Sequence, residues 1–234
     1  MVSPTNYIPV ASRDDRTRGD FIVQVYRHLF GALAAFVAFE TLLFTTGVAG
    51  SMYDFLAGSR GGWLLIFGGF MIVSWMATTA AHDVTNPSRQ YAGLFGIALA
   101  QALIFAPFLY LMFNVQGGKA TVGAAAVITG LGFTALSGVA YTTRRDLSFL
   151  RPLVGWGMVC GLLLIVAAVL FGLELGIWFS VAMIAVAGAS ILYQTQAVMR
   201  DYPSEAYVGA AVQLFASMML MFWYVLRLLA QMRN

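Results

Sequence analysis

Residues 21–46 read FIVQVYRHLFGALAAFVAFETLLFTT, and this stretch decides the class of fold. A hydrocarbon core of ~30 Å is crossed by about 20 helical residues at 1.5 Å per residue, so one helix through this stretch spans a bilayer. Of the ten acids in the chain, Glu40 alone lies inside such an apolar stretch. A charged side chain in a bilayer costs roughly 2.5 to 3.5 kcal/mol and usually faces a protein interior, a partner or water. Glu40 is therefore the first candidate functional residue.

The rest of the chain has the same apolar character. Hydrophobic residues make up 60% of the 234 residues, charged residues 10%, and the mean hydropathy is +0.81. This composition predicts an all-α integral membrane protein in a lipid bilayer. Residues 1–20 form a polar N-terminal tail, and residues 21–234 form a domain of seven transmembrane helices with short connections. The predicted spans are residues 21–46, 63–81, 91–113, 121–143, 152–171, 177–199 and 206–229.

The distribution of basic residues predicts a cytoplasmic N-terminus, because cytoplasmic loops carry an excess of Lys and Arg. An odd number of spans then places the C-terminus outside, although Arg227 and Arg233 favour the opposite side. The short basic clusters nowhere form a long run, so no nucleic-acid partner is expected. One predicted side carries Arg13, Arg16, Arg18, Arg27, Arg89, Arg144, Arg145, Arg151 and Arg200, and the other carries Arg60, Lys119, Arg227 and Arg233.

Enzyme motifs fit the chain poorly. His28 and His82 have no second His or Cys at metal-ligand spacing, so neither a metal site nor another cofactor is expected. Ser137 lacks the leading glycine of a nucleophile motif, and no histidine occurs in the later spans to activate it. We therefore expect a protein that is not an enzyme.

A sparse set of polar residues lies within the predicted spans. Ser190 and Gln194 share one helix face, and Gln213 and Ser217 share another, because each pair is separated by four residues. The two faces provide either interhelical hydrogen bonds, worth about 0.6 kcal/mol each on average, or part of a permeation path. Glu40 belongs to such a path or is a protonated or paired structural acid. The guanidinium of Arg227 either reaches an interface or pairs with an acid.

Two packing predictions concern the fourth and fifth spans. Small residues recur every four positions at Ala126, Gly130, Thr134 and Gly138, which favours close packing within the bundle over a dimer interface. The apolar neighbours of Cys160 predict that its side chain is buried.

Three segments resemble the Bax inhibitor-1 family, most closely its bacterial YccA-like branch. Residues 140–150 read AYTTRRDLSFL and contain the loop motif Arg144, Arg145 and Asp146, residues 188–196 read GASILYQTQ, and residues 213–229 end in LRLL. The resemblance implies six helices around a central C-terminal helix, and a bacterial inner-membrane protein with a cytoplasmic N-terminus. It also implies a calcium leak controlled by two aspartates. Gln194 and Ser217 occupy those two positions, and neither titrates near physiological pH.

The YccA-like branch is associated with modulation of the ATP-dependent membrane protease FtsH and with stress response. The leading hypothesis is therefore a non-enzymatic regulator that acts through membrane partners, to which the N-terminal tail offers an unstructured end. The alternative is a calcium or proton leak. In that alternative Glu40 supplies the charge, Gln194 and Ser217 line a neutral constriction, Gln213 extends their polar face, and Arg227 modulates entry.

Overall fold

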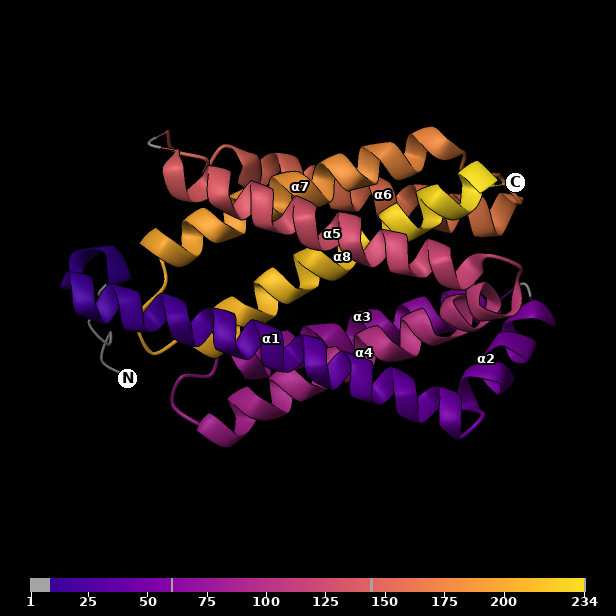
Figure 1. Ribbon diagram of the computed structural model, residues 1–234, viewed down its shortest axis with the longest axis horizontal. Helices are drawn as coiled ribbons and strands as arrows, with labels where there is room; N and C mark the ends of the chain where they lie inside the picture. The colour runs from indigo at the N-terminus through magenta and orange to yellow at the C-terminus, as the bar shows by residue number, and fades with distance from the viewer. Residues whose placement is uncertain (1–8, 60, 144, 234) are drawn as a thin grey trace.

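The computed structural model describes residues 9–59, 61–143 and 145–233, which fold almost entirely into helices (Figure 1). Each of the seven predicted spans overlaps a helix that is long and apolar enough to cross a membrane, so the predicted fold class is confirmed. The elements are η1 (Val10–Ser12), α1 (Asp15–Thr45), α2 (Val48–Ala57), α3 (Gly62–Ala81), α4 (Pro87–Asn114), α5 (Gly118–Thr142), α6 (Leu150–Phe171), α7 (Ile177–Arg200) and α8 (Tyr207–Arg233).

The sequence did not predict α2, a helix of ten residues that lies where we expected a connection. Gly47 has a φ of +78°, a left-handed conformation that glycine adopts without strain, and it separates α2 from the end of α1. The helix packs on α4, where a Cβ on Gly50 would lie 3.2 Å from the ring of Tyr110. Because α2 is too short to span a bilayer, hydropathy alone did not distinguish it from a loop.

Helix α8 is the centre of the bundle. It packs against α1, α3, α4, α5 and α7, and Leu214, Phe215 and Leu226 on α8 are fully buried. Figure 1 shows α8 in yellow, crossing between α1 and α5. The predicted central C-terminal helix is therefore present. Within the described ranges, α6 is the one long helix that does not pack on α8. It packs on α7 and α3 instead.

Helices α3 and α4 lie very close together at Gly93 of α4. A Cβ at this position would lie 2.4 Å from the carbonyl oxygen of Ala77 and 2.5 Å from the amide nitrogen of Ala81. Only a residue without a side chain fits there, and this contact fixes how the two helices cross.

The first described residues are anchored to the bundle. The Val10 amide donates a 2.8 Å hydrogen bond to the carbonyl oxygen of Tyr202 in the α7–α8 loop, and the Val10 side chain is buried. Asp14 caps α1 by accepting a 3.1 Å hydrogen bond from the Thr17 amide. Residues 15–20, which the sequence assigned to the polar tail, therefore belong to the first turns of α1.

The described part of the chain begins and ends at opposite ends of the long axis of the bundle (Figure 1). We call the end with η1 and the α3–α4, α5–α6 and α7–α8 loops the N-terminal end, and the other the C-terminal end. At the C-terminal end Arg233 donates to the hydroxyl of Thr121, at 2.7 Å, and to the carbonyl oxygen of Gln116. Arg233 therefore holds the α4–α5 loop. Arg60 and Arg144, which the sequence assigned to opposite sides of the membrane, lie outside the described residues.

Both packing predictions are wrong. On α5 the buried residues include Ala125, Phe133 and Ser137, whereas Ala126, Thr134 and Gly138 are exposed. Nothing lies within 4 Å of a Cβ built on Gly130 or Gly138. The side chain of Cys160 is exposed on α6. Both predictions fail for the same physical reason. Lipid is as apolar as a protein interior, so a pattern of apolar or small residues does not show whether a helix face contacts lipid or protein.

Candidate functional site

Glu40 lies in a pocket of about 490 Å³ between four helices. Its side chain is 8% exposed, and neither carboxylate oxygen has a hydrogen-bond partner among the described residues. The hydroxyl of Thr129, across the pocket on α5, is buried and equally without a partner there. The lining residues are Leu33, Phe36, Val37, Glu40, Thr41, Phe44 and Thr45 of α1, Leu109 and Phe113 of α4, Val122, Ala126 and Thr129 of α5, and Met218, Met219 and Phe222 of α8.

The helix packing explains the position of this pocket. Helices α1 and α5 both pack on α8, their backbones do not come close to each other within the described ranges, and the pocket lies between them. Phe36, Glu40 and Phe44 follow at intervals of four and share one face of α1, which turns toward the pocket. The carboxyl group is therefore surrounded mainly by apolar walls, and no Lys or Arg is among the lining residues to pair with it.

A second group of polar side chains lies between α7 and α8. The hydroxyls of Ser190 and Ser217 form a 2.8 Å hydrogen bond, so the two predicted polar faces do meet. The antiparallel register that pairs these serines also brings Gln194 to the level of Gln213. Both glutamines are half-buried. None of these four residues lines the Glu40 pocket.

A third group of polar contacts surrounds Arg227, near the C-terminal end of the bundle. Its guanidinium donates a 2.8 Å hydrogen bond to the carbonyl oxygen of Leu175 in the α6–α7 loop and lies 5.3 Å from the centroid of the Phe179 ring. Gln231 donates to the same carbonyl oxygen at 3.0 Å. The salt bridges among the described residues, Arg18–Asp15 and Arg89–Asp83, do not include Arg227. Arg227 thus holds a loop and lines a separate pocket of about 340 Å³ between α3, α4, α6 and α8.

The loop motif is held by a residue that the sequence reasoning missed. Gln196, 4% exposed near the end of α7, donates a 2.9 Å hydrogen bond to the carbonyl oxygen of Arg145. Its own side-chain oxygen accepts a 2.7 Å hydrogen bond from the Leu147 amide. The two segments AYTTRRDLSFL and GASILYQTQ are therefore in contact, and a glutamine within an apolar span was the signal for it. Arg144 of the motif lies outside the described residues.

The charged side chains of this loop point outward. Arg145 and Asp146 are exposed, and Asp146 accepts a 2.9 Å hydrogen bond from the Ser148 amide. This hydrogen bond lowers the pKa of the Asp146 carboxyl, and the nearby charge of Arg200 acts in the same direction. Asp146 is therefore a fixed negative charge at neutral pH.

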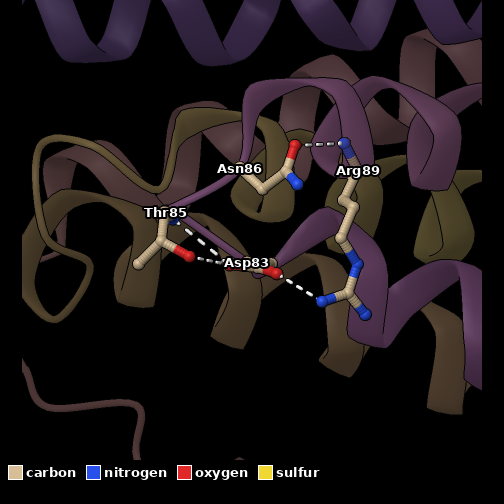
Figure 2. Close-up of polar contacts among 4 residues, drawn as sticks. All are labelled: Asp83, Thr85, Asn86 and Arg89. Atoms are coloured by element: carbon tan, nitrogen blue, oxygen red, sulfur yellow. Dashed lines mark hydrogen bonds and ion pairs between the residues drawn. The ribbon is translucent and has the colours of Figure 1, made fainter. Parts of the chain in front are cut away.

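The loop between α3 and α4 lies at the same end of the bundle (Figure 1), and Figure 2 shows its polar contacts. Asp83 accepts hydrogen bonds from the hydroxyl and the amide of Thr85, at 2.6 and 3.2 Å, and a 2.7 Å bond from Arg89. Asn86 caps α4 by accepting a 3.2 Å bond from the Arg89 amide, and Pro87 opens the helix. Mainly the Thr85 hydroxyl lowers the pKa of Asp83.

A model of the family described as "Inhibitor of apoptosis-promoting Bax1" matches residues 18–234, which include Glu40, the α5–α6 loop and the polar residues of α7 and α8. The chain belongs to the Bax inhibitor-1 family. An uncharacterised Pseudomonas aeruginosa protein is 30% identical over 52% of this chain and 55% of its own length. An uncharacterised membrane protein of Vibrio cholerae is 26% identical over 62% of both chains. An uncharacterised Neisseria meningitidis protein is 23% identical over 80% of this chain and 82% of its own.

The chain thus spans less than two thirds of the length of the first two relatives. No solved structure matches the chain significantly. Membership of the family and the seven apolar helices make it an integral membrane protein.

Proposed function

We propose that this Bax inhibitor-1 family member is a non-enzymatic regulator that acts by binding another membrane protein through its α5–α6 loop. The observation that carries the proposal is the pair of hydrogen bonds between the Gln196 side chain and the loop backbone, one donated and one accepted by Gln196. A buried glutamine that satisfies the Arg145 carbonyl and the Leu147 amide restrains this part of the loop. A partner that binds a fixed loop loses less conformational entropy than one that must order it.

The loop also has the composition of a binding surface. It exposes the charges of Arg145 and Asp146, and beside them the ring of Phe149, which is 64% exposed. Arginine and aromatic residues are enriched where protein interfaces concentrate their binding energy. Following the resemblance to the YccA-like branch, the partner is an FtsH-like ATP-dependent membrane protease, and the loop lies on the cytoplasmic side of a bacterial inner membrane.

Degradation of a membrane substrate by the reconstituted protease, with and without this protein, tests the proposal. We expect the protein to change the degradation rate, and Arg145→Glu and Gln196→Ala to remove that change. Arg16→Glu is the matched control, because it makes the same change of charge at an exposed position of the same end. If wild-type protein leaves the rate unaltered, or if Arg16→Glu has the same effect as Arg145→Glu, the proposal is wrong.

Residues 1–8 of the N-terminal tail, which precede η1 and do not include Arg16, are the second contact that we propose with the protease. Deletion of residues 1–18 would also remove the Asp14 cap and the anchor of Val10. Deletion of residues 1–8 keeps both, so it isolates the contribution of the tail. We expect this shorter deletion to abolish engagement by the protease, while the thermal stability of the protein stays unchanged.

The alternative function is a cation leak, and the unpartnered carboxylate of Glu40 is the observation that favours it. Calcium flux into liposomes that contain the purified protein tests this alternative independently of any protease. Flux above that of empty liposomes, lost in Glu40→Gln and retained in Arg145→Glu, would support the leak over the regulator.

A further inference from the structure

The pocket around Glu40 opens sideways between α1 and α5, toward the lipid. Val37 and Thr41 on α1 and Ala126 on α5 line the pocket and are exposed, so they form its rim. We propose that this pocket binds a lipophilic organic cation, an ammonium group on an apolar body, which enters from the bilayer and pairs with Glu40. This site is separate from the α5–α6 loop and does not depend on the function proposed above.

The charge of the ligand follows from the two unpartnered groups. Buried polar atoms are nearly always hydrogen-bonded, so each exception requires a physical reason. Here both carboxylate oxygens of Glu40 and the hydroxyl of Thr129 are buried without a partner among the described residues, and they line the same pocket. An ammonium group offers N–H donors and a positive charge, and it therefore satisfies all three oxygens.

The apolar body of the ligand follows from the walls. The rings of Phe36, Phe44, Phe113 and Phe222 line the pocket, and aromatic faces attract organic cations as well as apolar groups. The volume of about 490 Å³ lies within the range of about 300 to 1,000 Å³ that is typical of sites for small organic molecules.

The residues that line the pocket are poorly suited to calcium and to phospholipid headgroups. Calcium takes about 6 to 8 oxygen ligands, and the pocket offers a single carboxylate with a few threonine hydroxyls. A zwitterionic phospholipid headgroup would bring a phosphate, and no Lys or Arg is among the lining residues to balance it. Glu40 is the one acidic residue among the lining residues and no basic residue lies beside it there, so a ligand with a net positive charge is the one that can form an ion pair in this pocket.

Equilibrium dialysis of protein in lipid nanodiscs, with empty nanodiscs subtracted, tests the proposal. The probes are 4-phenylbutylamine, which is protonated at neutral pH, and the uncharged 4-phenylbutanol. We expect the amine to bind saturably and at least roughly tenfold more tightly than the alcohol. Glu40→Gln should weaken amine binding by roughly tenfold and leave alcohol binding unchanged. Glu174→Gln, which removes an exposed acid of the α6–α7 loop, should change neither.

A second variant tests the position of the site. Ala126→Phe places a ring at the rim, and we expect it to weaken the binding of both probes while the melting temperature shows that the protein is folded. The proposal is overturned if the alcohol binds as tightly as the amine, or if Glu40→Gln leaves amine binding unchanged. Saturable binding of radioactive calcium that depends on Glu40 and displaces the amine would also overturn it, because the site would then belong to an inorganic cation.

Discussion

The hydroxyls of Ser190 and Ser217 form one of the polar contacts that join α7 to the central helix, and the hydrogen bond from Ser180 to Gln231 is another. Hydrogen bonds of this kind between membrane helices contribute about 0.6 kcal/mol on average and up to about 1.7 kcal/mol. We predict that Ser190→Ala and Ser217→Ala each lower the free energy of unfolding by about 1 kcal/mol or less, with a coupling energy near 0.6 kcal/mol in the double mutant. Unfolding in mixed micelles measures the cycle. Strictly additive effects would show that the two hydroxyls do not interact.

Asp83 makes a pH-dependent contribution to stability. Its pKa in the folded protein is lowered, first by the Thr85 hydroxyl and also by Arg89. A carboxyl with a lowered pKa stabilises the fold fully above its ordinary value, near 3.8, and loses that contribution as the pH falls through the lowered value. We predict that the melting temperature of wild-type protein falls more between about pH 5 and pH 3 than that of Thr85→Val. Asp83→Asn should remove the same part of the pH dependence, and equal slopes in all three proteins would contradict the prediction.

At the scale of residues, the sequence predicted which side chains share a helix face better than it predicted which side chains contact each other. The spacing of Ser190 with Gln194 and of Gln213 with Ser217 correctly placed two polar faces that meet, because helical periodicity is a local property. Gln196 was missed as the partner of the α5–α6 loop, because that contact joins segments about 50 residues apart. Whether Glu40 is paired was equally beyond the sequence, since the answer depends on what α5 and α8 place beside it.

At the scale of elements, Gly93 sets the distance between α3 and α4. We predict that Gly93→Ala lowers the free energy of unfolding by about 1 to 3 kcal/mol or more, because its Cβ would meet backbone atoms of α3 that cannot rotate away. Gly96→Ala is the matched control on the same helix. Its Cβ would approach the side chain of Ala77 at 3.4 Å, an ordinary contact, so we expect little change or a slight gain from helix propensity. Equal losses in both variants would mean that the close approach is not what limits this position.

The elements themselves were largely predictable, and the exceptions share a cause. Hydropathy found the seven long helices, because about 20 consecutive apolar residues rarely occur outside helices that cross a membrane. It missed α2, which has ten residues. It also misjudged which face of α5 is buried, since Phe133 faces the bundle while Ala126 and Gly138 face outward. Lipid and protein interior are both apolar, so the sequence of one helix does not specify which side each occupies.

At the scale of the whole molecule, α8 separates three polar sites from one another: the serine pair, the Glu40 pocket and the contacts of Arg227. Ser217 faces α7, Met218 and Met219 face the Glu40 pocket, and Arg227 faces the α6–α7 loop. A central helix that presents different side chains to each neighbour supports separate sites around one axis. This arrangement is the reason that the proposed amine pocket and the proposed protease-binding loop can be tested independently.

The orientation of the molecule gives the last prediction. Arg227 and Arg233 lie at the C-terminal end, and both guanidiniums donate to carbonyl oxygens of loops there. Their positions therefore follow from loop contacts, and we expect the larger basic cluster near the N-terminus to set the orientation. In a Cys160→Ala background we predict that Met232→Cys reacts with a membrane-impermeant thiol reagent in intact bacterial cells, whereas Ser12→Cys reacts only after permeabilisation. Both positions are exposed. Labelling of Ser12→Cys in intact cells would invert the orientation, and labelling of both positions there would mean a mixed population.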